Sequence, residues 1–361
     1  AKKRRRSNLF FCPFSLVQAL GMIHAGATGE TSREMEKTLG FLQDIRTTHR
    51  LLKAAGDAYV SSGSGSSSGA GHRFTLANSV WVQRGFPLRA SYKNSVGQVF
   101  GGTVRPQSFT KRRVQAIRRI NRWVSKNTNG KIKKIVSRRT VSPGTRLVLA
   151  NAVYFLGRWS KPFPKEDTKK RPFRTARGRT VRAATMAMKE KALFGQTPNL
   201  KALSLSYRGS RLAMLFVLPK KGKRLALVAK ALKASSLKKL LDDMKEYEVD
   251  MRIPRFTLET SYRLEAPLKG LGIKRLFKPN AQLTGISPKK GLRVDRVLQK
   301  AFCKVDEKGT EAAAATAGMV AIGGYSRPKK ATFYAQRPFL FTIYDTRTGA
   351  LVFMGHITHP K

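Results

Sequence analysis

Acidic residues are scarce in this sequence. Twenty aspartates and glutamates accompany 72 lysines and arginines, which gives a formal net charge of +52 over 361 residues. Carboxylates are therefore too few to nominate a pair for acid–base catalysis. Self-repulsion at this charge destabilises a folded chain, so we expect a polyanion to be both a partner and a stabiliser. Composition does not separate nucleic acid from a heparin-like glycosaminoglycan, and deliberate supercharging is a third explanation.

Cysteine and histidine are also rare, and the familiar catalytic motifs are missing. Cys12 and Cys303 lie far apart without metal-ligand spacing, so we expect buried free thiols and not a disulfide framework. The five histidines are scattered, and the chain has no Gly-X-Ser-X-Gly elbow, phosphate loop or His-Glu-X-X-His motif. These absences predict a protein that is not an enzyme and that holds no metal or cofactor.

Long apolar runs and glycosylation acceptors are absent too. No apolar run approaches the length of a transmembrane helix, so we expect no membrane insertion. The chain has no Asn-X-Ser/Thr glycosylation acceptor, and this absence favours an intracellular or nuclear protein. A secreted protein remains an open alternative.

The residues that are present predict a globular chain of helices and strands. Apolar residues make up 41% of the sequence, which excludes wholesale disorder. Helical periodicity predicts two helices within residues 13–42, with Thr31 to Glu34 capping the second, and further helices over residues 42–60 and 220–241. Residues 264–277 predict a helix followed by a turn. Apolar runs predict strands over residues 74–82, 147–155, 212–218, 250–258, 293–305, 339–344 and 351–357, the last two as a hairpin. Residues 61–71 are rich in glycine and serine and predict a loop.

Residues 111–139 form the densest basic segment. Val114, Ile117, Ile120, Trp123 and Val124 recur at steps of three and four, which predicts a helix with one buried face. The cations of this segment are our first choice for a polyanion-binding surface, because each neutralised anion releases counterions: Arg112, Arg113, Arg118, Arg119, Arg122, Lys126, Lys131, Lys133 and Lys134. A plain solvated face explains the same periodicity and stays open.

Residues 304–338 lie between two strand-like runs and have an unusual composition. Thr310, Glu311 and the four alanines that follow could start a helix. Glycines flank the run on both sides, however, and no apolar stripe is available to dock a helix. In a strand, alternate residues from Thr310 to Gly318 would share one face made only of small side chains. The pattern therefore favours a segment that could insert between packed strands.

Several motifs, in order along the chain, resemble the serpin family of protease inhibitors. They are residues 8–15 (NLFFCPFS), 127–132 (NTNGKI), 149–155 (LANAVYF), 307–317 (EKGTEAAAATA), 337–341 (RPFLF) and 353–356 (FMGH). The resemblance spans nearly the whole chain. It implies an α+β serpin fold in a single domain over residues 1–361, which lacks most of the usual first helix. The fold has a large central mixed β-sheet, additional sheets, about eight or nine helices and an exposed reactive-centre loop.

The resemblance also implies a mechanism for residues 304–338, which match the hinge and reactive-centre loop. A protease would cleave the loop, and the freed hinge would insert as a new strand, which traps the protease as an acyl-enzyme. The native form would then be metastable. The implied hinge residues are Glu307, Gly309, Thr310, Glu311, Ala312, Ala313, Ala314, Ala315 and Thr316.

The scissile bond stays open among several candidates near the end of the loop. Counting by analogy points to Gly323-Gly324, while the extra length of the loop leaves Tyr325-Ser326 as an alternative. Tyr325 would suit a chymotrypsin-like serine protease, and Ile322 before Gly323 would suit a papain-like cysteine protease.

Two positions depart from the family pattern where the resemblance places the shutter, the region that opens the sheet. Cys12 stands where the family commonly has a serine, and Gln299 stands where it commonly has a histidine. By the same resemblance, Ser15, Asn151 and Trp159 belong to the shutter and to the breach beyond it. Gln299 is still able in principle to hydrogen-bond Asn151.

The sequence thus predicts a monomeric suicide-substrate protease inhibitor that also binds a polyanion, either a heparin-like glycosaminoglycan or nucleic acid. Its basicity, lack of glycosylation acceptors and Ile322-Gly323 pair make it similar to a chromatin-associated avian member of the family. The alternative is a non-inhibitory serpin-fold chaperone or chromatin-binding protein in which the charge is the function.

Overall fold

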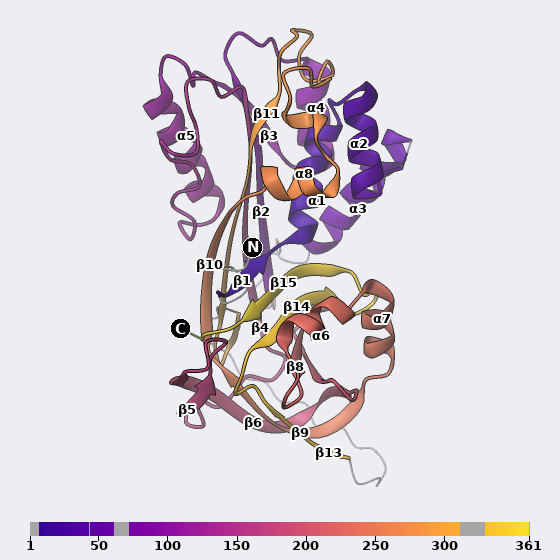
Figure 1. Ribbon diagram of the computed structural model, residues 1–361, viewed down its shortest axis with the longest axis vertical. Helices are drawn as coiled ribbons and strands as arrows, with labels where there is room; N and C mark the ends of the chain where they lie inside the picture. Colours follow the sequence, from indigo (N-terminus) through magenta and orange to yellow (C-terminus); the bar gives the residue numbers. More distant parts are fainter. Residues whose placement is uncertain (1–6, 43, 61–71, 311–328, 361) are drawn as a thin grey trace.

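The computed structural model describes residues 7–42, 44–60, 72–310 and 329–360. Within these residues it has two β-sheets, one of six strands and one of nine, with α-helices packed on their faces (Figure 1). The eight α-helices of the described residues are α1 (Pro13–His24), α2 (Gly29–Leu39), α3 (Ile45–Val60), α4 (Ala90–Phe100), α5 (Arg113–Asn127), α6 (Leu225–Ala231), α7 (Ala234–Asp242) and α8 (Glu265–Leu271). None of the helices in these ranges is both long and apolar enough to span a bilayer.

The six-stranded sheet is mixed and has the strand order β10-β11-β4-β2-β3, with β12 paired to β4. Strands β11 and β4 run parallel, as do β2 and β3, while the other pairs are antiparallel. The strands are β2 (His72–Gln83), β3 (Thr103–Gln107), β4 (Leu147–Arg158), β10 (Phe256–Arg263), β11 (Val294–Val305) and β12 (Gly309–Thr310).

Helices cover both faces of this sheet, with α5 on one side and α1, α2, α4 and α8 on the other (Figure 1). Because side chains alternate along a strand, one strand serves both layers. In β2, Val80 and Val82 join the core beneath α1 and α4, whereas Trp81 joins the core beneath α5. This double coverage explains the nearly continuous apolar run of β4.

The nine-stranded sheet has the order β1-β15-β14-β8-β7-β6-β9-β13, with β5 paired to β6, and α6 and α7 pack against it. Its inner face meets the lower part of the six-stranded sheet in an aromatic core that includes Phe155, Phe341 and Phe353. The strands are β1 (Leu9–Phe11), β5 (Lys169–Arg174), β6 (Thr180–Gln196), β7 (Leu200–Ser206), β8 (Leu212–Pro219), β9 (Lys245–Pro254), β13 (Lys330–Tyr334), β14 (Phe339–Asp345) and β15 (Leu351–Ile357).

Most predicted elements are confirmed, and three details are wrong. Helix α2 begins at Gly29 after Thr28, so Thr31 is not a cap; it is buried, and its hydroxyl accepts from the Gln282 N–H at 3.0 Å. Residues 220–241 form two helices and not one, with a break at residues 232–233 between α6 and α7. Residues 250–258 belong to two strands, β9 and β10, because the chain leaves β9 after Pro254, which has no N–H to continue a ladder.

Candidate functional site

Strands β4 and β11 pair along most of their length and then part. Their parallel pairing ends with Phe302 opposite Tyr154. Past that point β4 pairs with β12, so that Thr310 lies opposite Gly157. Thr310 is fully buried and therefore already occupies a strand position in the six-stranded sheet. We call this end of the two strands, together with residues 306–310, the breach.

A tight turn between β11 and β12 delivers Thr310 to this position. Asp306 and Gly309 exchange both backbone hydrogen bonds, at 2.8 and 3.1 Å. Gly309 has a φ of 141°, and a Cβ built on it would lie 2.0 Å from the carbonyl oxygen of Gly157. Only glycine satisfies both the conformation and the close approach to β4.

Two stacked aromatic rings hold this turn in place. Trp159 and Tyr207 stack with ring centroids 4.8 Å apart, and both are buried. Trp159 donates from its indole to the carbonyl of Asp306 and from its backbone to that of Lys308, both at 3.0 Å. The Tyr207 hydroxyl and the Thr310 hydroxyl lie 2.9 Å apart as hydrogen-bond partners. Burial holds the pKa of Tyr207 well above its usual value, so the phenol stays neutral.

A buried carboxylate anchors the same turn to its surroundings. Glu307 is 5% exposed, and its side chain accepts from the Thr168 hydroxyl at 2.7 Å and pairs with Arg255 at 3.5 Å. Its backbone carbonyl accepts from Phe163 at 2.8 Å. A buried charge needs such partners to be tolerated.

Sequence reasoning named Glu307, Gly309, Thr310 and Trp159, which the structure brings together at the breach. Their partners Tyr207, Thr168 and Arg255 were not predicted, and they lie in three separate segments outside the strands. No spacing pattern in the chain connects these residues, so only their contacts find them.

Farther along β4 and β11, buried amides link both strands to the start of α1. Gln299 Nε2 donates to Asn151 Oδ1 at 2.7 Å and to the Cys12 carbonyl at 2.9 Å, while Gln299 Oε1 accepts from the Cys12 N–H at 3.1 Å. The hydrogen bond between Gln299 and Asn151 is the one that the sequence allowed. Asn151 Nδ2 donates in turn to Ser15 and to Asn78 Oδ1. We call Cys12, Ser15, Asn78, Asn151 and Gln299 the shutter cluster.

Every member of the shutter cluster is at most 3% exposed, so its polar atoms depend on one another. Asn78 was not predicted, although it interrupts the apolar residues of β2 directly opposite Asn151. Cys12 donates from Sγ to the Val352 carbonyl at 3.0 Å, and burial raises the pKa of its thiol. Both cysteines are buried and free, as predicted, and Cys12 acts as a hydrogen-bonding group that remains protonated.

The rest of the predicted loop lies outside the described residues. This applies to the hinge residues from Glu311 to Thr316 and to the scissile-bond candidates from Ile322 to Ser326. The described chain stops at Thr310 and resumes at residue 329, and β13 then pairs parallel with β9.

The predicted polyanion residues lie on α5 and in the segment that follows it. Of the nine, Arg112, Arg118, Arg119, Arg122, Lys126, Lys131, Lys133 and Lys134 are exposed, and Arg113 is half-buried. Ile120 and Val124 are buried as expected, but Val114 is 39% exposed and does not belong to the buried face, which Ala116 completes. Lys131 lies 6.0 Å from the ring centroids of Tyr154 and Phe302 and so reaches the sheet that α5 covers.

Comparison with known proteins gives one consistent result. A family model described as "Serpin (serine protease inhibitor)" matches residues 1–360. A serpin-like protein of Thermococcus kodakarensis is 38% identical over 98% of this chain and 81% of its own length, and the leukocyte elastase inhibitor of Sus scrofa is 34% identical over 98% and 93%.

The solved structures agree. Native protease nexin-1, crystallised with heparin, superposes with a TM-score of 0.87 at 30% identity and covers 99% of this chain and 94% of its own. Together with the mixed six-stranded sheet and the second, nine-stranded sheet, these matches establish that the chain belongs to the serpin family of serine protease inhibitors.

Proposed function

We propose that this protein is a suicide-substrate inhibitor whose cleaved loop inserts between β4 and β11. The observation that carries the proposal is the placement of Thr310, which is buried and paired with Gly157 of β4 at the point where β11 has diverged. The next strand positions beside β4 would be filled by residues 311–317, which are small apart from Glu311. The described ladder thus has the direction and the spacing that further insertion would continue.

The chemistry would come from the target protease. Its serine or cysteine attacks the scissile carbonyl carbon, the peptide bond breaks, and the new amine leaves with residues C-terminal to the cut. The acyl-enzyme that remains is linked to the hinge, so insertion pulls the protease away and distorts its site before water can hydrolyse the ester or thioester. Residues Ile322 to Ser326 hold our candidates for the cut.

We further propose that the exposed cations of α5 and its following segment bind a polyanion. Among the described residues, no carboxylate lies within ion-pair distance of Arg118, Arg119 or Arg122. Neutralising such cations releases counterions and relieves the self-repulsion of a chain at +52. The structural relative protease nexin-1 was solved with heparin, which supports this part of the proposal.

The inhibitory part is tested by mixing the protein with chymotrypsin-like and papain-like proteases. We expect a complex of summed mass that survives SDS, and the loop-cleaved protein should unfold at a higher temperature than the intact one. Clean cleavage without a complex or a gain in heat stability would contradict inhibition. It would instead favour the non-inhibitory chromatin-binding alternative, whose activity should survive loop mutation and collapse with added salt.

A further inference from the structure

Two hollows at the end of the molecule away from α4 share one wall, the turn between β5 and β6. The first, of about 720 Å³, lies between this turn and the segment that joins β8 to α6. The second, of about 590 Å³, lies between the turn and β10. Both are lined by Thr175, Ala176 and Thr358. The hollows therefore lie on two faces of one shared wall, and we call the two together the groove.

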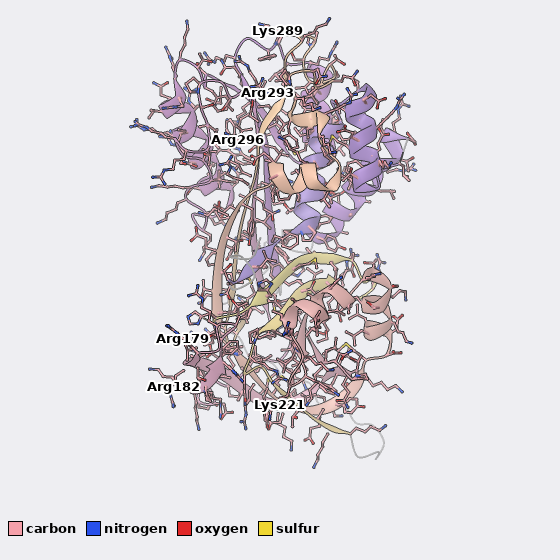
Figure 2. All side chains as sticks on the ribbon, in the orientation of Figure 1. Arg179, Arg182, Lys221, Lys289, Arg293 and Arg296 are labelled. Carbon is pink, nitrogen blue, oxygen red and sulfur yellow. The ribbon has the colours of Figure 1, made fainter. Side chains whose placement is uncertain are left out.

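Cations line this groove from three separate parts of the chain. The turn supplies Arg174, Arg177 and Arg179, the β8–α6 segment supplies Lys223 and Arg224, and the residues before β14 supply Arg337. We call these six residues the basic groove. Figure 2 shows Arg179 of the turn close to Arg182 of β6, and Lys221 at the same end of the molecule, so the positive surface extends past the groove.

Carboxylates do not neutralise the basic groove. Among its described lining residues Glu259 alone is acidic, and Lys300 already pairs with it at 2.5 Å. None of the six cations has a carboxylate within ion-pair distance in the described part of the chain. A concave, low-dielectric site with charges of one sign concentrates counterions of the other sign.

Arg337 is the half-buried member of the basic groove, whose other five cations are exposed, and its side chain is held in place. Its guanidinium donates twice to the Pro219 carbonyl, at 2.9 and 2.6 Å, and burial lowers its pKa. An incoming anion would offset that desolvation.

Backbone hydrogen bonds also fix the wall of the groove. Arg174 N donates to Gln336 O at 2.8 Å and Ala176 N donates to Thr358 O at 3.1 Å, which ties the β5–β6 turn to both ends of the C-terminal hairpin. The wall that carries three of the arginines is therefore fixed before a ligand arrives, which reduces the entropic cost of binding.

We propose that the basic groove binds a sulfated polysaccharide chain, at a site separate from α5. Arginine forks match the geometry of sulfate oxygens, and a linear ligand that crosses the shared wall would meet cations in both hollows. This inference rests on the polyanion affinity proposed above but not on the inhibitory mechanism.

The lining favours a polysaccharide over nucleic acid. Sites for single-stranded nucleic acid stack bases on aromatic side chains, yet no Phe, Tyr or Trp is among the described residues that line the two hollows. Double-stranded DNA would meet the rim, since a hollow of this volume admits one narrow chain and not a duplex. Small and aliphatic residues such as Leu225, Ala226 and Pro338 line the groove between the cations and leave room for sugar rings.

The test measures the affinity for a heparin octasaccharide over a series of NaCl concentrations. The variant Arg174→Gln/Arg224→Gln removes one cation from each wall of the larger hollow. We expect its Kd to rise about tenfold at about 0.15 M salt and its salt slope to fall by about two, one for each lost contact. Neither side chain has a partner in the described structure, so the melting temperature should not change.

Two matched variants make the result specific, since each also removes two exposed cations. Arg84→Gln/Lys93→Gln changes the β2 and α4 end of the molecule, and Arg118→Gln/Arg119→Gln changes α5. The first pair should change heparin affinity less than about twofold. If the groove variant behaves like this pair, the groove inference is wrong, whereas the wider polyanion proposal fails only if the unmodified protein does not bind heparin.

Binding to nucleic acids tests the alternative that the groove recognises any polyanion and not a polysaccharide in particular. The groove variant should lose less affinity for duplex DNA and for oligo(dT) than for heparin. An equal loss for all three ligands would overturn the assignment to a polysaccharide. Formation of the protease complex without heparin should be the same in all variants.

Discussion

At the shutter cluster, β4 and β11 lie side by side and amide side chains from both strands are hydrogen-bonded to each other and to α1. At the breach, the same two strands have parted, and β12 pairs with β4 in the place of β11. The shutter is held by Asn151 and Gln299, and the breach by Gly309, Thr310 and the rings of Trp159 and Tyr207.

A strand could therefore enter the sheet at the breach, whereas the shutter cluster would resist its entry. At the breach the hinge residues Gly309 and Thr310 are already paired with β4, so in our proposed mechanism insertion would extend an existing ladder. At the shutter, separating the strands breaks hydrogen bonds among atoms that no water reaches, which is costly. We infer that the shutter cluster holds most of the barrier that our mechanism requires.

The largest expected effect comes from a charge at the breach. In Thr310→Arg a cation replaces a side chain that is fully buried, and an unpaired buried charge costs about 3–5 kcal/mol. Insertion should fail, so SDS-stable complex should fall on the order of 100-fold or more while the loop is still cleaved.

The control for this change is Thr310→Ser, which keeps the hydroxyl and the small volume and should retain the complex. Circular dichroism and the unfolding temperature report whether each variant folds. If Thr310→Arg folds and still forms the complex at the normal rate, Thr310 does not take part in insertion.

A smaller effect is expected at the shutter. Gln299→Ala leaves Asn151 Oδ1 and the backbone groups of Cys12 without their partner, at a cost of about 1–3 kcal/mol for a buried group. We expect faster unfolding in urea and faster spontaneous loop insertion, measured as loss of inhibitory activity on warming.

Gln336→Ala is the matched control, because Gln336 is exposed and its side chain has no partner in the described structure. It should leave both rates unchanged. Equal unfolding rates for Gln299→Ala and the unmodified protein would show that the shutter cluster does not hold the barrier.

The smallest effect is a pH dependence to which the breach contributes through His72, alongside the half-buried His49 and His356, whose pKa values burial also lowers. His72 lies opposite Gly157 in the β2–β4 ladder, is 2% exposed and stacks on Phe155. Burial lowers its pKa from 6.5, partly opposed by the Tyr59 backbone. The unfolded chain therefore binds a proton that the folded chain does not, so stability is complete above pH 6.5 and is lost as the pH falls below that value.

The measurement is the unfolding free energy between about pH 7.5 and about pH 5. His72→Phe should reduce the slope of this curve without abolishing it, because His49 and His356 still contribute. Gln299→Ala should lower the unfolding free energy at every pH without changing the slope. The shutter cluster does not titrate in this range, because burial raises the pKa of Cys12. A slope that is unchanged in His72→Phe would assign the pH effect to other parts of the molecule.

Much of the fold could be predicted from local pattern. The apolar run of β4, the closing hairpin β14–β15 and the buried stripe of α5 follow from side-chain periodicity, which is a property of neighbouring residues. The errors have tertiary causes. The break between α6 and α7 and the exposure of Val114 depend on what each helix packs against, which periodicity does not contain.

Part of the candidate site could likewise be predicted from the sequence, and part could not. The small side chains of the hinge, the glycine at position 309 and the excess of cations are properties of the sequence itself, and several ordered motifs were enough to predict the family. Tertiary structure alone decided that Tyr207 meets Thr310, that Arg255 and Thr168 hold Glu307, and that the basic groove gathers cations from three parts of the chain. The physical reason is that hydrogen bonds and charge pairing act over a few ångströms in space, whereas the partners lie tens to hundreds of residues apart along the chain.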